Sequence, residues 1–152
     1  MKYAALSLAV IFGVCLIVTG YLFLTCDVRV NSLGASVRNA SDDPVTFSRI
    51  NDQIVYGGGE DLGDISGYVF YSWRIGVSNT TFAPLEMVQA SISQAPGDIA
   101  MVSRNEPIRI EARTDGEIEI TVLSRVNTGA RRSATVSWRL WGREDSLPLR
   151  VE

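Results

Sequence analysis

Carboxylates are the main reactive side chains that this sequence offers. The chain contains no His, its only Lys is Lys2, and both of its cysteines, Cys15 and Cys26, precede residue 27. Histidine is the usual general base near neutral pH and the commonest metal ligand. Residues 27–152 therefore cannot build a Ser-His-Asp triad, a zinc site of His and Cys, or a lysine Schiff base. Carboxylate chemistry, hydroxyl groups and cations bound by oxygen remain.

An acidic, glycine-rich loop at residues 57–64 is the candidate cation site of the sequence. It contains Glu60, Asp61 and Asp64, whose oxygens suit Ca²⁺. Three more acids from nearby segments are candidates to join them: Asp42, Asp43 and Asp52. The loop lacks the regular ladder of an EF-hand, so we favour an ordinary solvated loop, and we predict neither a bound metal nor a cofactor.

Paired carboxylates on strands could in principle support glycoside hydrolysis. The acids that alternate with apolar residues are Glu111, Glu117 and Glu119. They share the predicted solvent face with Arg109 and Arg113, so cross-strand ion pairing explains them better than catalysis. We therefore predict that the protein is not an enzyme, and we keep a carboxylate-only glycoside hydrolase as an alternative.

Three aromatic residues form the candidate interaction surface. Tyr68, Phe70 and Trp141 fall on strand faces opposite the apparent core residues, and clustered exposed aromatics mark binding surfaces. Two alternatives are that residues 28–56 fold over them or that they line a membrane interface. A basic pair, Arg131 and Arg132, is either a contact for anionic lipid headgroups or a solvated turn.

The elements that would position these residues are β-strands. Five apolar residues alternate along residues 68–78: Val69, Tyr71, Trp73, Ile75 and Val77. Similar alternation predicts strands near 85–93, 99–103, 108–112, 117–122, 134–141 and 147–151. A switch of parity predicts a β-bulge near Met87, and Pro148 suggests an edge strand.

Strands of this length separated by short turns indicate an antiparallel β-sandwich spanning residues 27–152. Before residue 68 the pattern is less regular, with short strands predicted at 28–30, 45–50 and 53–56. We expect no helix longer than one turn in this domain. An open barrel is the structural alternative.

The stretches 71–80 and 108–120 resemble segments of the CARDB/NEW3-type immunoglobulin-like modules. The first reads YSWRIGVSNT, and the second joins IRIEA to DGEIEI through Arg113 and Thr114. The resemblance spans residues 67–151, although the family's Asn-Thr-Gly turn is absent, since Thr81 follows Asn79 and Thr80. It implies an immunoglobulin-like sandwich used for adhesion, spacing or accessory binding, and it implies no site.

An uncharged N-terminal segment precedes the domain. Residues 3–25 carry no charge, and residues 4–24 would form a helix roughly 31 Å long, which matches a hydrocarbon core of about 30 Å. The sequence therefore predicts a transmembrane helix within an uncleaved anchor of residues 1–26. The alternatives are a signal peptide cleaved after residues 18–20 and a lipoprotein attached through Cys26, whose thiol could also be acylated, pair with a second chain or stay unmodified.

Charge and context complete the functional expectation. The net charge is −3, which argues against nucleic acid as a partner. Positive groups on the two sides of the segment nearly balance, but a short leader favours a single-pass protein of the cell membrane with its domain outside the cytoplasm. We expect a membrane-anchored accessory module that contacts lipid through its helix and binds a protein partner. A subunit of a surface filament or envelope complex is the alternative.

Overall fold

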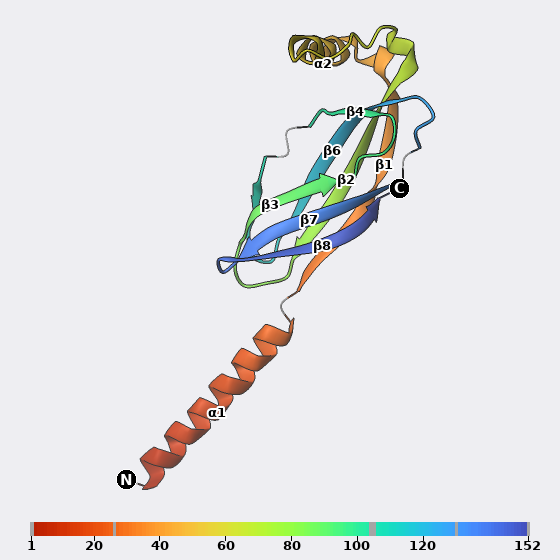
Figure 1. The fold of residues 1–152 in the computed structure, drawn as a ribbon. Coiled ribbons are helices and arrows are strands. Elements are labelled where there is room, and N and C mark those ends of the chain that lie inside the picture. The colour runs from red at the N-terminus through yellow and green to blue at the C-terminus, as the bar shows by residue number, and fades with distance from the viewer. Residues whose placement is uncertain (1, 26, 104–105, 130, 152) are drawn as a thin grey trace.

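The computed structural model describes residues 2–25, 27–103, 106–129 and 131–151, and within the N-terminal helix it describes the side chains of residues 10–21. The chain forms a helix followed by two antiparallel sheets (Figure 1). In chain order the elements are α1 (Lys2–Thr25), β1 (Val28–Asn39), η1 (Ala40–Asp42), α2 (Pro44–Tyr56), η2 (Ile65–Gly67), β2 (Tyr68–Asn79), β3 (Leu85–Ile92), β4 (Asp98–Met101), β5 (Ile108–Ile110), β6 (Asp115–Arg125), β7 (Arg132–Leu140) and β8 (Arg143–Val151).

The two sheets form a mainly β sandwich, as the alternation of apolar residues predicts. One sheet has the strand order β1-β2-β6-β4 and the other β5-β3-β7-β8. Their facing sides enclose the main core, in which Trp73, Ile75 and Val136 are completely buried. Strand β8 lies at the edge of its sheet, which is where Pro148 was expected.

Strand β2 is the central element of the first sheet. Trp73 lies opposite Ala35 of β1 and Ile120 of β6, so its indole ring enters the core from the middle of the sheet. The first six residues of β2 are buried on both faces of the sheet. A second layer must therefore cover the outer face of β2 at this end.

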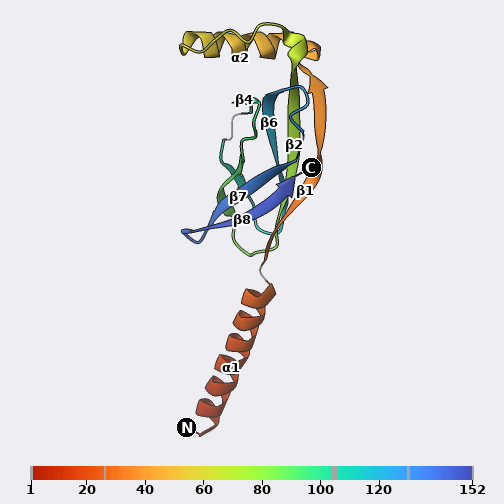
Figure 2. The ribbon, with the colours of Figure 1, turned by 45° about the vertical axis from the view of Figure 1, so that its right-hand side comes forward.

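Helix α2 provides that layer and corrects the prediction of two short strands over residues 45–56. Phe47 and Ile50 are three residues apart on one helical face, and both are buried against Tyr68, Phe70 and neighbouring apolar side chains. The rings of Phe47 and Tyr68 are 5.4 Å apart. The helix lies across the end of the sandwich and projects beyond it (Figure 2). This arrangement gives the domain a second, smaller core.

The bulge in β3 was predicted from the sequence, whereas most of the length of β1 was not. The bulge near Met87 is confirmed: the pairing of β3 shifts there, and Met87 has a φ of 53°. Strand β1 was predicted as three residues but spans twelve, because its pairing with β2 continues through residues that are mostly exposed. Exposure on both faces removes the apolar alternation by which such a strand is recognised.

Helix α1 covers the segment predicted as a membrane span. It forms a continuous helix that extends away from the sandwich, at the end opposite α2 in both ribbon views. Within the part of the chain that the structure describes, no helix is both long and apolar enough to cross a membrane. The helix itself is thus confirmed, while its predicted transmembrane character is not supported.

Candidate functional site

The predicted aromatic surface is divided by the fold. Tyr68 is 8% exposed and Phe70 is 1% exposed, so the prediction that both face a partner is wrong. Their side chains contribute to the second core beneath α2, as the alternative of a covering segment proposed. Trp141, in contrast, is 63% exposed at the β7–β8 turn. Because α2 covers Tyr68 and Phe70, the outer side of α2 is what faces the solvent at that end of the sandwich.

The small lobe formed by α2 and the loop after it is held by polar contacts. Asp43 caps the helix by accepting a hydrogen bond from the Thr46 backbone N–H at 3.1 Å, and Pro44 follows as the first helical residue. This hydrogen bond, supported by the charges of Arg38 and Arg49, lowers the pKa of Asp43 despite some desolvation. The cap fixes where α2 begins and how it leaves β1.

The returning loop is attached to the helix and to β2. The Leu62 backbone N–H donates to the Asn51 side chain at 2.9 Å, and the Tyr68 hydroxyl donates to the Leu62 carbonyl at 2.9 Å. Tyr68 thus uses its ring in the second core and its hydroxyl to hold the loop. Residues 43–68 therefore form one packed unit on the end of the sandwich.

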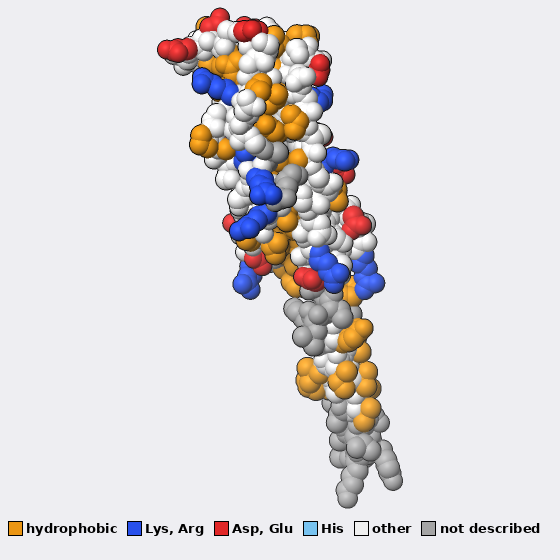
Figure 3. All heavy atoms as spheres, turned by 90° about the vertical axis from the view of Figure 1, so that its right-hand side faces the viewer, with side chains coloured by type: hydrophobic (Ala, Val, Ile, Leu, Met, Phe, Trp, Pro, Cys, Tyr) orange, Lys and Arg blue, Asp and Glu red, His pale blue; other side chains and the backbone are white. Residues whose placement is uncertain are grey.

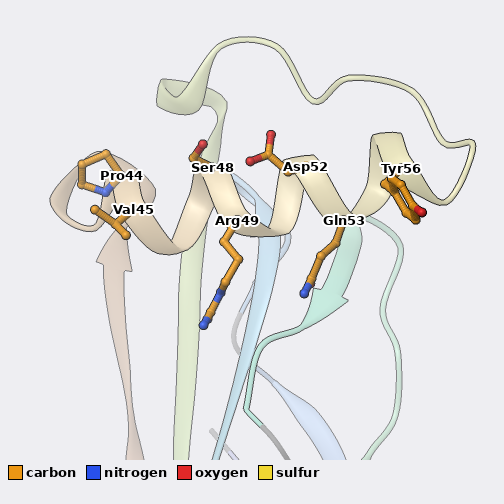
Figure 4. Close-up of a pocket in the computed structure, with 7 residues that line it drawn as sticks. All are labelled: Pro44, Val45, Ser48, Arg49, Asp52, Gln53 and Tyr56. Carbon is orange, nitrogen blue, oxygen red and sulfur yellow. The ribbon is translucent and has the colours of Figure 1, made fainter.

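The outer face of α2 is the most developed candidate surface. A shallow hollow of about 780 Å³ lies along it. Seven residues of this single helix line the hollow: Pro44, Val45, Ser48, Arg49, Asp52, Gln53 and Tyr56 (Figure 4). Tyr56 is 96% exposed and Val45 is 79% exposed. Because one helix alone lines it, the feature is an open surface and not an enclosed cavity.

The side chains on this face are arranged by type along the helix. Val45 and Tyr56 lie near its two ends, with Arg49 and Gln53 extending together from its middle. Ser48 and Asp52 point to the other side, toward the returning loop. Apolar and aromatic groups flanking an arginine are typical of protein-binding surfaces, whereas small-molecule sites enclose their ligands.

Two carboxylates of the acidic loop accept hydrogen bonds from nearby groups. Asp61 accepts hydrogen bonds from the Asn51 amide at 3.2 Å and the Gly63 backbone N–H at 2.8 Å, and Asp64 accepts from Ser66. The hydrogen bonds from Ser66 lower the pKa of Asp64. Among the described residues no group of three or more acids, Cys or His is placed to hold a metal ion. Glu60, Asp61 and Asp64 thus share one loop, and the hydrogen bonds that Asp61 and Asp64 accept help to fix its conformation.

Glu117 and Glu119 lie on the exposed surface of β6 and Glu111 lies in the β5–β6 loop, all close to arginines. Glu117 is 3.9 Å from Arg74 on the neighbouring strand, and Glu111 is 3.0 Å from Arg109. Glu119 is the register partner of Arg74. Among the described residues, ion pairing across strands is therefore present, but between Glu117 and Arg74, and not with Arg109 or Arg113, which the sequence placed on the same face.

One arginine and two cysteines complete the predicted sites. Arg132 is 7% exposed and forms an ion pair with Asp98, so the interpretation of this residue as a lipid contact or a solvated turn residue is wrong. Its burial was not visible from sequence because Asp98 is distant along the chain. Cys15 is exposed on α1. Cys26, the candidate for lipidation or an intermolecular disulfide, lies outside the described residues.

Comparison with known proteins adds no family. No family model matches the chain, and no curated protein matches it. A Bacillus subtilis protein assigned as a lipoprotein is 13% identical, with a TM-score of 0.46 over 84% of this chain and 38% of its own. A FixG-related protein from Vibrio parahaemolyticus is 11% identical, with a TM-score of 0.41 over 84% of this chain and 94% of its own. The chain thus spans well under half of the first protein, and neither likeness bears on activity or partner.

Proposed function

We propose that this protein is a membrane-anchored accessory module whose sandwich presents the outer face of α2 to a protein partner. The observation that carries the proposal is the placement of the two helices at opposite ends of the sandwich (Figure 1). Helix α1 has no charged residue after Lys2 and is apolar, whereas α2 is packed on one side and displays Tyr56 on the other. The sandwich then acts as a rigid spacer between an anchor and a binding surface.

The apolar surface of α1 supports an anchoring role. Exposed apolar side chains occur at consecutive positions, including Val10, Ile11 and Phe12, which are 58%, 61% and 66% exposed. Consecutive helical residues point in directions about 100° apart, so the apolar surface extends around the helix. Figure 3 shows hydrophobic side chains along the described part of α1 and charged side chains over the sandwich. Such a helix needs an apolar environment, and a bilayer provides one.

The position of the domain outside the cytoplasm rests on the sequence alone. An apolar helix joined directly to a folded domain is typical of a signal-anchor, which exports the domain that follows it. Protease added to intact cells should then digest residues 27–152. Protection of the domain until the cells are lysed would place it in the cytoplasm and contradict this part of the proposal.

The strand order supports an immunoglobulin-like arrangement for the spacer. Strands β1, β2, β6 and β4 follow the ABED order of an immunoglobulin constant-type sheet, and β3, β7 and β8 follow the CFG order. The short strand β5 is added beside β3. Where the A and B strands are ordinarily joined by a turn, this chain inserts residues 40–67, which contain α2. An insertion that builds its own core suits a binding element added to a spacer.

The chemistry of the α2 face indicates the kind of partner that would fit it. Tyr56 offers a large amphipathic ring, and Arg49 offers five N–H donors to carboxylate or carbonyl oxygens. Tyrosine and arginine are enriched among the residues that dominate binding energy in protein interfaces. We expect a folded protein partner with an apolar patch beside acidic or carbonyl groups.

Substitution at the two exposed apolar positions tests the proposal. The double variant Val45→Ser with Tyr56→Ser removes apolar surface without touching either core, so it should fold normally. Tagged full-length protein, extracted from its own cells in mild detergent, should recover one partner in the wild type and lose it in this variant. The matched control is Leu33→Ser with Val37→Ser, because these β1 residues are 50% and 53% exposed. Loss of the partner in the control, or equal recovery in all three proteins, would contradict the proposal.

A further inference from the structure

The segment that joins α1 to the sandwich is short, and Asp27, where the sandwich begins, is held by hydrogen bonds. Cys26 alone separates the last residue of α1, Thr25, from Asp27. The Asp27 backbone N–H donates to the Thr80 hydroxyl at 2.9 Å, while the Thr80 hydroxyl and backbone N–H donate to the Asp27 carbonyl at 2.7 and 3.1 Å. Two Cα steps of about 3.8 Å therefore connect α1 to a point that is attached to the β2–β3 loop.

Three connections of the sandwich gather at this end, and we refer to them as the α1-proximal loops. They are the β2–β3 loop at 80–84, the β5–β6 loop at 111–114 and the β7–β8 turn at 141–142. The register places them together, because Val28 pairs with Asn79, Ser78 pairs with Asp115, and Glu86 pairs with Arg139. All three lie at the end of the sandwich from which α1 extends.

A buried amide holds two of these loops in a defined position. Asn79 is 1% exposed, and its side-chain N–H groups donate to the carbonyl oxygens of Ala83 and Glu111 at 2.9 Å. The β2–β3 loop and the β5–β6 loop are thereby joined. As a result, the Arg113 guanidinium lies over the Phe82 ring at 4.1 Å from its centre.

The α1-proximal loops carry two exposed aromatic rings. Phe82 is 44% exposed beside Arg113, and Trp141 is 63% exposed two positions before the exposed Arg143. Trp141 and Gly142 have φ values of 51° and 77°, so the indole is carried at the tip of a tight turn. A groove of about 310 Å³, lined by Val28, Leu140, Trp141 and other residues, runs from this turn to the start of β1.

We infer that the α1-proximal loops form a second membrane contact, in which Phe82 and Trp141 lie in the lipid headgroup layer and fix the sandwich upright on the bilayer. This inference rests on the proposed anchoring by α1. If α1 is embedded, the short and bonded connection keeps these loops at the bilayer surface. Tryptophan prefers the water–hydrocarbon boundary, and arginine beside an aromatic ring can extend its charge to headgroup phosphates.

The orientation that follows places α2 far from the lipid. Strand β1 has twelve residues, which at about 3.3 Å each extend roughly 40 Å. An upright sandwich would then hold the outer face of α2 clear of the headgroups. The contact made by the α1-proximal loops thus sets the height at which the proposed binding surface is displayed.

Quenching of tryptophan emission by lipid tests this inference. The full-length protein is reconstituted into vesicles of phosphatidylcholine and phosphatidylglycerol, with and without bromine on the acyl chains. Trp73 and Trp138 are 0% and 6% exposed, so the difference between wild type and Trp141→Phe reports the emission of Trp141. We expect brominated lipid to remove most of that emission, and acrylamide in the water to remove less of it than before reconstitution.

A matched control moves the reporter to the opposite end of the sandwich. In the double variant Trp141→Phe with Tyr56→Trp, acrylamide should quench the added emission and brominated lipid should not. If the wild type floats with the vesicles but Trp141 is quenched by acrylamide alone, the second contact is refuted and anchoring stands. If the wild type does not float with the vesicles, both the anchoring proposal and this inference fail.

Discussion

Arg132 on β7 and Asp98 on β4 form a buried, two-pronged ion pair that joins the two sheets. The Arg132 Nε and Nη2 atoms lie 3.2 and 2.8 Å from the two Asp98 carboxylate oxygens, and the side chains are 3% and 4% exposed. The Arg132 guanidinium also lies 5.6 Å from the centre of the Trp73 ring. One charged pair thus connects both sheets and the largest core residue.

Removing the arginine should strongly destabilise the domain. Arg132→Met leaves the Asp98 carboxylate buried without its partner, which typically costs about 3–5 kcal/mol. The free energy of unfolding, measured by urea denaturation at pH 7, should fall by that amount. The exposed Arg109–Glu111 pair is the control, since Glu111→Gln should cost less than about 1 kcal/mol. Equal losses in the free energy of unfolding for the two variants would show that the buried pair stabilises the domain no more than an exposed pair does.

The same pair predicts how stability depends on pH. Burial raises the pKa of Asp98, but hydrogen bonds from Arg132, the Ala95 backbone N–H and Ser124, with the Arg132 charge, lower it overall. A carboxylate with a lowered folded-state pKa contributes stability above its unfolded pKa of about 3.9, and this contribution is lost as the pH falls through the folded value. When the free energy of unfolding is measured at stepwise lower pH, it should therefore fall more steeply for the wild type than for Asp98→Asn. Parallel curves for the two proteins would contradict this assignment.

The second core predicts a local effect on α2. Phe47→Ala removes a ring that is 6% exposed against Tyr68, a change that commonly costs about 3–5 kcal/mol. Because this core is separate from the main one, amide hydrogen exchange should accelerate across residues 44–56 and remain slow in β2 and β6. Val45→Ser on the exposed face of the helix should leave exchange unchanged. Uniform acceleration in every strand would mean that the two cores unfold together.

The turn at Trp141 predicts a gain of stability on substitution. A residue other than glycine with positive φ is strained by about 1–2 kcal/mol, and asparagine tolerates this conformation best. Trp141→Asn should therefore raise the free energy of unfolding in detergent by about 1 kcal/mol. The same variant should lose the lipid contact, because asparagine lacks the indole ring. A lower stability for Trp141→Asn would indicate that the indole packs on the hairpin instead of serving the membrane.

The sequence was informative where apolar residues that face the main core alternate along a strand. In β2, β6 and β7 the apolar residues alternate along the strand, and the parity change at Met87 marked the bulge. Most of strand β1 could not be predicted because most of its side chains are exposed and it is held through backbone pairing with β2. Backbone hydrogen bonds do not depend on the side chains, so a strand held in this way has no characteristic pattern of residue types.

Helix α2 was missed although the sequence contained its signals. Asp43 followed by Pro44 is a common helix start, and Phe47, Ile50 and Ile54 recur at helical spacing. The short apolar segments around them were instead assigned to strands. That error also misplaced Tyr68 and Phe70, because the outer face of a strand is solvated only when no other layer covers it. The burial of the outer face of β2 follows only when α2 is known to cover it.

The burial of Arg132 could not be predicted for a different reason. Its partner Asp98 lies 34 residues earlier, on a strand of the other sheet. Both residues are next to turn sequences, where charged side chains are ordinarily solvated. Only the packing of β4 near β7 makes the pair, and the spacing along the chain contains no sign of it.

The α2 face, at the end remote from α1, is the surface that we propose binds the partner. The most direct measurement is photo-crosslinking in intact cells from a light-activated amino acid placed at position 56, compared with one at the exposed position 119 on β6. We expect a protein adduct of a single discrete mass from position 56 and none from position 119. An adduct from position 119 alone, or no protein adduct from position 56, would contradict the proposal.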